Sequence, residues 1–101
     1  MIEIFKSVQF ESWLTALRDK QARARIVLRI RRLGLGNPGD VKPVGHGISE
    51  MRIDHGPGYR VYYLQRGITV VLLLCGGSKP TQAGDIALAR SIALQWKESP
   101  R

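Results

Sequence analysis

Charged and polar side chains gather in two neighbouring segments of this sequence, at a spacing that suits phosphate chemistry. Side chains alternate between the two faces of a strand, so residues two apart in an extended segment share a face. The polar set on one such face comprises Glu50, Arg52, Arg60 and Tyr62, and Lys79 follows in a later loop. Three fixed cations with a tyrosine and a carboxylate can hold a phosphodiester and stabilise charge that develops on it.

The alternative is that these side chains are ordinary solvated residues of a sheet. Ion pairs between Glu50 and Arg52 or Arg60 would then contribute little to stability, because water and salt screen exposed pairs. Composition alone favours this simpler interpretation.

Residue type and spacing argue against other kinds of chemistry. The soft metal ligands are Cys75, His46 and His55, and both histidines lie in glycine-rich turns without the paired spacing of a zinc site. The segment from Gly76 to Thr81 lacks the spacing of a nucleotide-binding loop. Cys75 lies in an apolar run without a neighbouring base, which predicts a packed thiol rather than a nucleophile. We therefore expect no metal and no cofactor.

The N-terminal third of the sequence predicts a strand followed by two helices. Residues Met1 to Phe5 are rich in β-formers. Ser7 is a candidate N-cap for a helix over Val8 to Leu17, where apolar residues recur at three- and four-residue spacing. A second helix over Lys20 to Leu33 follows a break near Asp19.

The middle of the sequence predicts a loop and then a sheet. Glycine and proline are dense between Gly34 and Gly47, which indicates a loop with at most a short strand from Val41 to Val44. Turns short enough for hairpins separate the next strands, so we expect an antiparallel meander whose last and most apolar strand is central. The strands cover Ile48 to Asp54, Tyr59 to Gln65 and Ile68 to Cys75.

The residues after these strands predict a break in the sheet at Gly76 to Thr81 and a last helix over Gln82 to Trp96, with Thr81 as its N-cap. The order of elements indicates one α+β domain over residues 1–101 with an antiparallel sheet. We expect an apolar face of the sheet to pack on the helix pair, leaving the polar set on the far side. The apolar face comprises Met51, Ile53, Val61 and Tyr63.

Charge and composition narrow the class of protein. The chain has 101 residues, 44% of them apolar, and its sixteen Lys and Arg against eight Asp and Glu give a net charge of +8. The apolar content is that of a folded domain, and the longest apolar run, Ile68 to Cys75, is far too short to span a bilayer. A single cysteine and the lack of a signal peptide predict a cytoplasmic protein without a membrane partner.

Much of the positive charge lies in one segment. Seven Lys and Arg between Arg18 and Arg32 face one acid, Asp19, so the fifteen residues carry +7 − 1 = +6. Arginine-rich charge on the polar side of a helix favours phosphate-rich partners. The candidate RNA contacts here are Arg23, Arg25, Arg29 and Arg32.

Several motifs resemble the RelE/ParE superfamily of toxin components, most closely its HigB-like "addiction module killer protein" branch. They are Glu50-Met-Arg52, Gly56-Pro-Gly-Tyr-Arg60-Val-Tyr-Tyr63, Gly76-Gly-Ser-Lys79, and Gln82 with Asp85-Ile86-Ala87. The likeness spans nearly the whole chain and outweighs the simpler interpretation of the polar face. It implies a RelE/ParE-like two-layer sandwich and a toxin held silent by a cognate antitoxin, often a helix-turn-helix DNA-binding protein.

The resemblance also implies a reaction: metal-free cleavage of mRNA in the ribosomal A site, by attack of a ribose 2′-OH on the neighbouring phosphate. Carried over to this chain, Arg52 and Arg60 would clamp the phosphate, and Lys79 would add charge or donate a proton. Tyr62 or Tyr63 would stack on a base or orient the hydroxyl. Glu50 would be the general base, or would orient an arginine.

The sequence departs from the better-known nucleases of this superfamily at its C-terminal end. Several of those have a catalytic His or Tyr there, and the segment after Lys79 contains neither. His55 lies in the turn between Arg52 and Arg60, so it could reach the rim of the site and contact RNA. Two other functions stay open: a ParE-like toxin that poisons DNA gyrase, and a basic RNA-binding module without toxicity.

Overall fold

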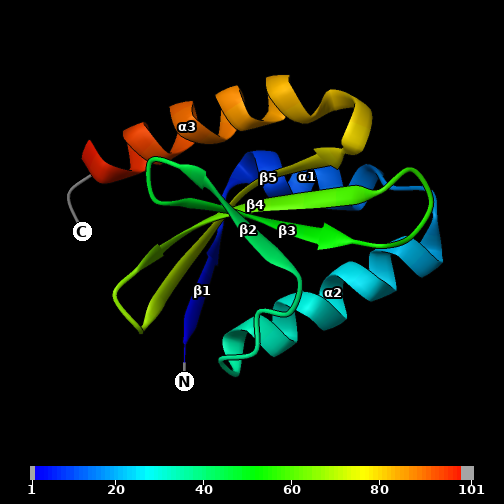
Figure 1. The fold of residues 1–101 in the computed structure, drawn as a ribbon, viewed down its shortest axis with the longest axis horizontal. Helices are drawn as coiled ribbons and strands as arrows, with labels where there is room; N and C mark the ends of the chain where they lie inside the picture. Colours follow the sequence, from blue (N-terminus) through cyan, green and yellow to red (C-terminus); the bar gives the residue numbers. More distant parts are fainter. Residues whose placement is uncertain (1, 99–101) are drawn as a thin grey trace.

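The computed structural model describes residues 2–98, with side chains as far as Trp96. A strand, two helices, four strands and a last helix follow one another, with a 3-10 turn before the last helix (Figure 1). The elements are β1 (Glu3–Lys6), α1 (Val8–Ala16), α2 (Lys20–Gly34), β2 (Val41–Gly45), β3 (Ile48–Ile53), β4 (Tyr59–Arg66), β5 (Val70–Ser78), η1 (Lys79–Thr81) and α3 (Gln82–Glu98). Within these residues, no helix has the length and apolar character that crossing a membrane requires.

Side-chain caps start both N-terminal helices, one at the predicted cap Ser7 and one at the predicted break near Asp19. Ser7 Oγ accepts the backbone N–H of Phe10 at 2.9 Å at the start of α1. Asp19 Oδ1 accepts the backbone N–H groups of Gln21 at 3.0 Å and Ala22 at 3.1 Å at the start of α2. These bonds satisfy N–H groups that have no partner within the helix, and they confirm the break near Asp19.

The five strands form one mixed sheet in the order β1-β5-β4-β3-β2. The meander from β2 to β5 is antiparallel as predicted, but β1 pairs parallel with β5, so the prediction of a wholly antiparallel sheet is wrong at this edge. After β1 the chain passes through two helices and enters the sheet again at the opposite edge, as β2. The meander then ends with β5 next to β1. The middle strand is β4, and β5 lies between β4 and β1.

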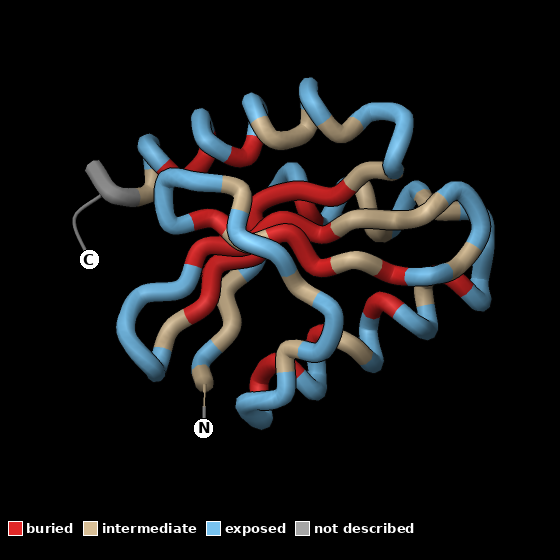
Figure 2. The backbone as a smooth tube through the Cα atoms, viewed as in Figure 1, coloured by how far each residue is buried: buried red, intermediate tan, exposed pale blue. Residues whose placement is uncertain are grey.

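Helices cover both faces of the sheet, so the predicted two-layer sandwich is wrong and α3 forms a third layer (Figures 1 and 2). The apolar set predicted to pack on the helix pair does so, in one core with Phe10 and Ile26. The opposite face is apolar as well and packs against Ala89, Ile92 and Ala93 of α3. Its buried sheet residues are Ile48, Tyr62, Leu64, Leu72, Leu74 and Cys75.

The glycine pair predicted to break the sheet instead continues β5. Gly76 pairs with Val61, and Gly77 pairs with Arg60. A Cβ on Gly76 would lie 2.3 Å from the ring of Trp13, and one on Gly77 would lie 1.7 Å from Asp85 Oδ2. The glycines therefore let α1 and α3 approach the same strand from opposite faces. The chain then turns through η1, whose N-cap is Ser78. Thr81 ends this turn immediately before α3, where its hydroxyl donates to Asp85 in the first turn of the helix.

Candidate functional site

The three cations singled out in the sequence lie around one open hollow of about 550 Å³, at the end of the sheet where β3 and β5 finish and β4 begins. Arg52 comes from β3, Arg60 from β4, and Lys79 from the first residue after β5. The backbone N–H of Lys79 donates to the carbonyl of Gly58 at 2.9 Å, which ties this residue to the turn between β3 and β4. The other residues around the hollow are Asp40, Ile53, Asp54, Gly56, Pro57 and Gly58.

Arg52 is the more accessible of the two arginines. Its side chain is 40% exposed and forms an ion pair with Asp40, with Nη2 2.9 Å from Oδ1. An ion pair this exposed is worth little energy, so an incoming phosphate can compete with Asp40 for the guanidinium.

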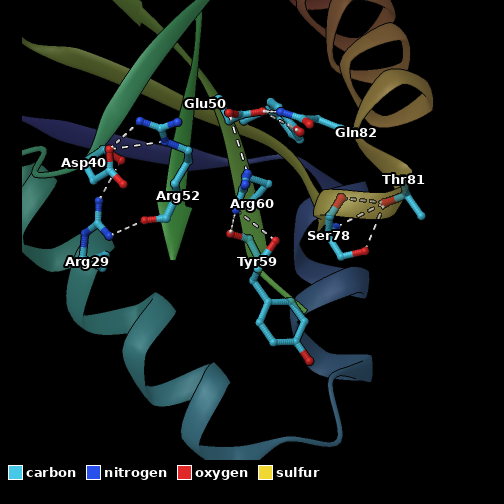
Figure 3. A network of polar contacts seen from close by, with 11 residues as sticks. Arg29, Asp40, Glu50, Arg52, Tyr59, Arg60, Ser78, Thr81 and Gln82 are labelled. Carbon is cyan, nitrogen blue, oxygen red and sulfur yellow. Dashed lines mark hydrogen bonds and ion pairs between the residues drawn. The ribbon is translucent and has the colours of Figure 1, made fainter. Parts of the chain in front are cut away.

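Arg60 is held more tightly, by backbone carbonyls on one side and by Glu50 on the other (Figure 3). Its side chain is only 12% exposed, and its Nη1 donates to the carbonyls of Gly58 at 3.1 Å and Tyr59 at 3.3 Å. Its Nε lies 3.7 Å from Oε1 of Glu50, too far for a hydrogen bond, and has no hydrogen-bond partner among the residues that the structure describes. The guanidinium is thus fixed in direction before any ligand arrives.

Glu50 and Tyr62 do not lie on an exposed face, because α3 covers them. Glu50 is 1% exposed and Tyr62 is fully buried. The Tyr62 hydroxyl donates to Glu50 Oε2 at 3.1 Å. Gln82 Nε2 donates to the same oxygen (Figure 3). Burial, with the Glu50 charge, raises the pKa of Tyr62 far above its usual range, so the phenol keeps its proton. Because Tyr62 is fully buried, the prediction that it stacks on a base or orients the hydroxyl is wrong.

Tyr63 and His55 also point away from the hollow. Tyr63 is 3% exposed, inside the core under the helix pair, so it has no surface for a base, and burial raises the pKa of its phenol. His55 Nε2 lies 3.0 Å from Oδ2 of Asp19, at the start of α2. The backbone N–H of Ala22 and then His55 lower the pKa of Asp19. His55 therefore joins the β3–β4 turn to α2 rather than lining the hollow.

The four predicted RNA contacts on α2 fall into different settings. Arg25 and Arg32 are exposed. Arg29 is partly buried, and its guanidinium donates to the carbonyls of Arg52, Pro38 and Asp40. Arg23 donates to the carbonyl of Leu17 and lies in a different group of α2 residues, with Lys20, Val27 and Arg31, away from the hollow.

Sequence reasoning missed three residues of this region as site components. Asp40 and Asp54 add carboxylates to the hollow, and Gln82 holds Glu50 from α3. Asp40 lies in the glycine- and proline-rich loop, where no periodicity signals its direction. Asp54 offered a signal, since it follows Arg52 at a strand spacing of two.

Among residues 2–96, no group of three His, Cys, Asp or Glu side chains is arranged to hold a metal ion. Cys75 is 2% exposed, and its Sγ donates to the carbonyl of Asp85 at 3.4 Å. Burial, then the Asp85 charge, raises the pKa of this thiol to about 12. The thiol is therefore packed and protonated, as predicted for a core cysteine.

Comparison with known proteins gives a family. Residues 12–93 match the family model described as "Phage derived protein Gp49-like (DUF891)". An uncharacterised protein from Haemophilus influenzae is 49% identical over 92 residues, which cover 91% of this chain and 93% of that protein. The match extends from α1 to α3 and includes every residue of the hollow. The chain therefore belongs to the Gp49-like family, a family related to the RelE- and HigB-like toxins of toxin–antitoxin modules.

Proposed function

We propose that this protein is the toxin of a type II toxin–antitoxin module and that it cuts mRNA on the ribosome without a metal. One observation carries the proposal: Arg52, Arg60 and Lys79 surround a single open hollow, although they come from three different strands or their ends. The Gp49-like family, which is associated with mRNA-cleaving toxins, supports the same conclusion. A cognate antitoxin is the partner that such a module requires, and we expect one of helix-turn-helix type.

The reaction is an internal transfer at phosphorus. The 2′-oxygen of a ribose attacks the adjacent phosphorus, a P–O2′ bond forms, and the P–O5′ bond breaks. The products are a 2′,3′-cyclic phosphate and a 5′-hydroxyl, with one proton leaving the nucleophile and one reaching the leaving oxygen. Arg52 and Arg60 stabilise the negative charge that builds on the non-bridging oxygens, and Lys79 faces the leaving oxygen as cation and proton donor.

Glu50 acts in this scheme by orienting Arg60. Its carboxylate is buried beneath α3, accepts hydrogen bonds from Tyr62 and Gln82, and pairs with Arg60. A 2′-OH therefore cannot approach it. A fixed anion behind Arg60 keeps the guanidinium directed at the phosphate, which lowers the reorganisation needed in the transition state. Glu50 is therefore a positioning residue, and the general base lies elsewhere.

The proposal is tested by expressing the protein from an inducible promoter and mapping transcript 5′ ends. Wild-type protein should arrest growth and produce new ends within reading frames. Arg60→Ala should abolish both effects, because it removes the guanidinium that stabilises the negative charge on the scissile phosphate. Arg90→Ala, an exposed arginine of α3 away from the hollow, is the matched control and should remain toxic.

Other outcomes would overturn the proposal. Growth arrest with gyrase-linked DNA breaks and no new transcript ends would identify a gyrase poison instead. No effect on growth would leave an RNA-binding module without toxicity. Arg60→Ala protein as toxic as wild type at equal abundance would remove the hollow from the mechanism.

A further inference from the structure

A second hollow lies directly beside the first. It has a volume of about 290 Å³ and is lined by Arg25, Leu28, Arg29, Arg32, Ile53 and Asp54. Two of these residues, Ile53 and Asp54, also line the first hollow, so the end of β3 forms the boundary between the two. The two hollows together make one continuous surface from Lys79 to α2.

The second hollow is cationic. Arg25, Arg29 and Arg32 follow at spacings of four and three, so they share one side of α2 and face a single acid, Asp54. Arg25 and Arg32 are exposed and available to a ligand. Guanidinium groups bind phosphate oxygens through paired N–H donors, which makes a phosphate the ligand that fits this hollow.

Arg29 fixes the distance between the hollows. Its Nη1 donates to the carbonyl of Arg52 at 2.6 Å, and its Nη2 donates to the carbonyl of Asp40 at 3.2 Å (Figure 3). The same Nη2 donates to the carbonyl of Pro38 at 3.1 Å. One side chain of α2 thereby forms hydrogen bonds to the backbone of Arg52 and to the loop that carries Asp40. A ligand that bridges the two hollows thus meets two phosphate sites already held in register.

Asp54 differs from the other carboxylate of the first hollow. Asp40 is occupied by the guanidinium of Arg52 at 2.9 Å. Asp54 is exposed, lies just beyond the end of β3, and forms no ion pair with the residues that the structure describes. It is the free carboxylate at the boundary between the two sites.

We propose that the second hollow binds the RNA phosphate immediately 5′ of the scissile one, and that Asp54 accepts the proton of the attacking 2′-OH. This inference rests on the proposed function. In a single strand, the ribose that carries the nucleophile lies between the scissile phosphate and the phosphate on its 5′ side. With those phosphates in the two hollows, this ribose lies at their boundary, where Asp54 is placed.

The proton balance follows from this placement. The Asp54 carboxylate takes the 2′-OH proton as the P–O2′ bond forms, and the O5′ that leaves receives its proton on the Lys79 side. Leu28, which is 43% exposed, supplies apolar contact for the ribose and its base. Asp54 is thus assigned as a catalytic residue, and Arg25 and Arg32 as substrate-binding residues.

The phosphate site is tested with short mRNAs on programmed ribosomes, in which one phosphate carries an uncharged methylphosphonate. Neutralising the phosphate 5′ of the scissile one should raise KM roughly tenfold for wild-type protein, the scale of two exposed charge contacts. The same change should have little further effect on Arg25→Gln/Arg32→Gln, which has already lost the contacts. The control Arg18→Gln/Arg31→Gln removes equal charge from α2 and the connection before it, outside the second hollow, and should respond like wild type.

Two results would overturn the phosphate site. One is an equal rise in KM for wild type and Arg25→Gln/Arg32→Gln when the 5′ phosphate is neutralised. The other is a rise in KM only when the phosphate on the 3′ side of the scissile one is neutralised. A binding measurement keeps this test separate from the proposed function. Fluorescence anisotropy measures the affinity for a labelled single-stranded RNA and does not require cleavage. Neutralising the phosphate should lower the affinity of wild type and of Arg18→Gln/Arg31→Gln, and should hardly change that of Arg25→Gln/Arg32→Gln. If wild type cleaves nothing but this pattern of affinities holds, the proposed nuclease fails while the RNA phosphate site stands.

The base assignment is tested by Asp54→Asn, which keeps the shape and removes the basic oxygen. We expect kcat to fall about 100-fold or more with KM nearly unchanged, the usual loss when a general base is removed. The rise of kcat with pH on the acid side of the profile should disappear as well. An Asp54→Asn protein with wild-type kcat and the same pH profile would overturn the assignment.

Discussion

Glu50 is a charged residue placed where water hardly reaches it. At 1% exposure, its carboxylate depends on the Tyr62 hydroxyl, the Gln82 amide and the Arg60 guanidinium for its stability. Burying a carboxylate is costly unless such partners are present. We interpret the cluster as the means by which α3 fixes the direction of Arg60, one layer below the open hollow.

The role of Glu50 predicts the behaviour of Glu50→Gln. The amide keeps the volume but loses the charge, and its NH₂ group faces either Arg60 or the other two donors, leaving a donor without an acceptor. We expect a loss of about 1–3 kcal/mol in the free energy of unfolding, together with a drop in kcat larger than any rise in KM. Urea unfolding and steady-state cleavage measure the two effects. Wild-type kcat in Glu50→Gln would show that Arg60 needs no anion behind it.

Cys75 gives the protein a sensitivity to alkaline pH. Burial raises the thiol pKa from its ordinary 9.0 to about 12, so the folded state holds the proton more tightly than the unfolded chain. The corresponding stability is fully present below pH 9 and is lost as the pH rises toward 12. The urea midpoint should therefore fall between about pH 8 and about pH 10.5, and should fall less in Cys75→Ala. Equal falls in both proteins would assign the effect to other groups, such as the buried tyrosines.

At the scale of elements, β5 is the strand on which both helical layers meet. Trp13 of α1 lies against Gly76, and Asp85 of α3 lies against Gly77. A bulge opposite Tyr62 and Tyr63 leaves Leu74 as the extra residue, so Leu74 and Cys75 both join the core under α3. The shift in alternation puts each glycine on the face where a helix approaches, and it keeps Lys79 at the end of the strand.

Substitutions of glycine by alanine show whether a glycine is needed for close packing or only adds freedom to the backbone. Gly76→Ala and Gly77→Ala should each destabilise the fold by about 1–3 kcal/mol or more, because the new methyl overlaps Trp13 or Asp85. Gly84→Ala in α3 is the matched control, since nothing lies within 4 Å of its Cβ position. There we expect a gain of about 0.5–1 kcal/mol from helix propensity and reduced chain entropy. Thermal unfolding followed by circular dichroism would rank the three, and a stable Gly77→Ala would mean that α3 can shift without cost.

At the scale of the whole molecule, charge is unevenly distributed and largely unpaired. The chain carries +8 in total, while the described residues form three ion pairs, one of them with a histidine. The Arg25, Arg29 and Arg32 side of α2 adjoins the hollow of Arg52, Arg60 and Lys79. A surface of this kind attracts polyanions over a distance, and repulsion among its own cations destabilises the fold.

This imbalance predicts opposite effects of salt on folding and on binding. Raising the NaCl concentration from about 0.02 M to about 0.2 M shortens the screening length, so the melting temperature of the free protein should rise by a few degrees. Over the same range, affinity for single-stranded RNA should fall, because counterions compete for the phosphates. Differential scanning calorimetry and anisotropy titrations test the pair. A melting temperature that falls with salt would show that attractive ion pairs outweigh the repulsion.

Local chemistry in the sequence determined the elements and much of the site. The caps at Ser7 and Asp19, the alternation in β3 and β4, and the glycine turns specify where helices and strands begin, because each depends on contacts within a few residues. The same alternation brought Arg52 and Arg60 to one face and left Lys79 at the strand end. These three residues surround the hollow, and their part in catalysis is a prediction that the experiments above address.

Only the tertiary structure decided how deep each of those side chains lies. The sequence marked Glu50 and Tyr62 as polar neighbours of the arginines, and only the docking of α3 on that face turned them into buried supports. The place of β1 beside β5 and the approach of Asp40 and Arg29 likewise depend on segments far apart in the chain. Strand alternation assigns a residue to a face, but burial depends on which other layer packs there, and that choice is made by the whole fold.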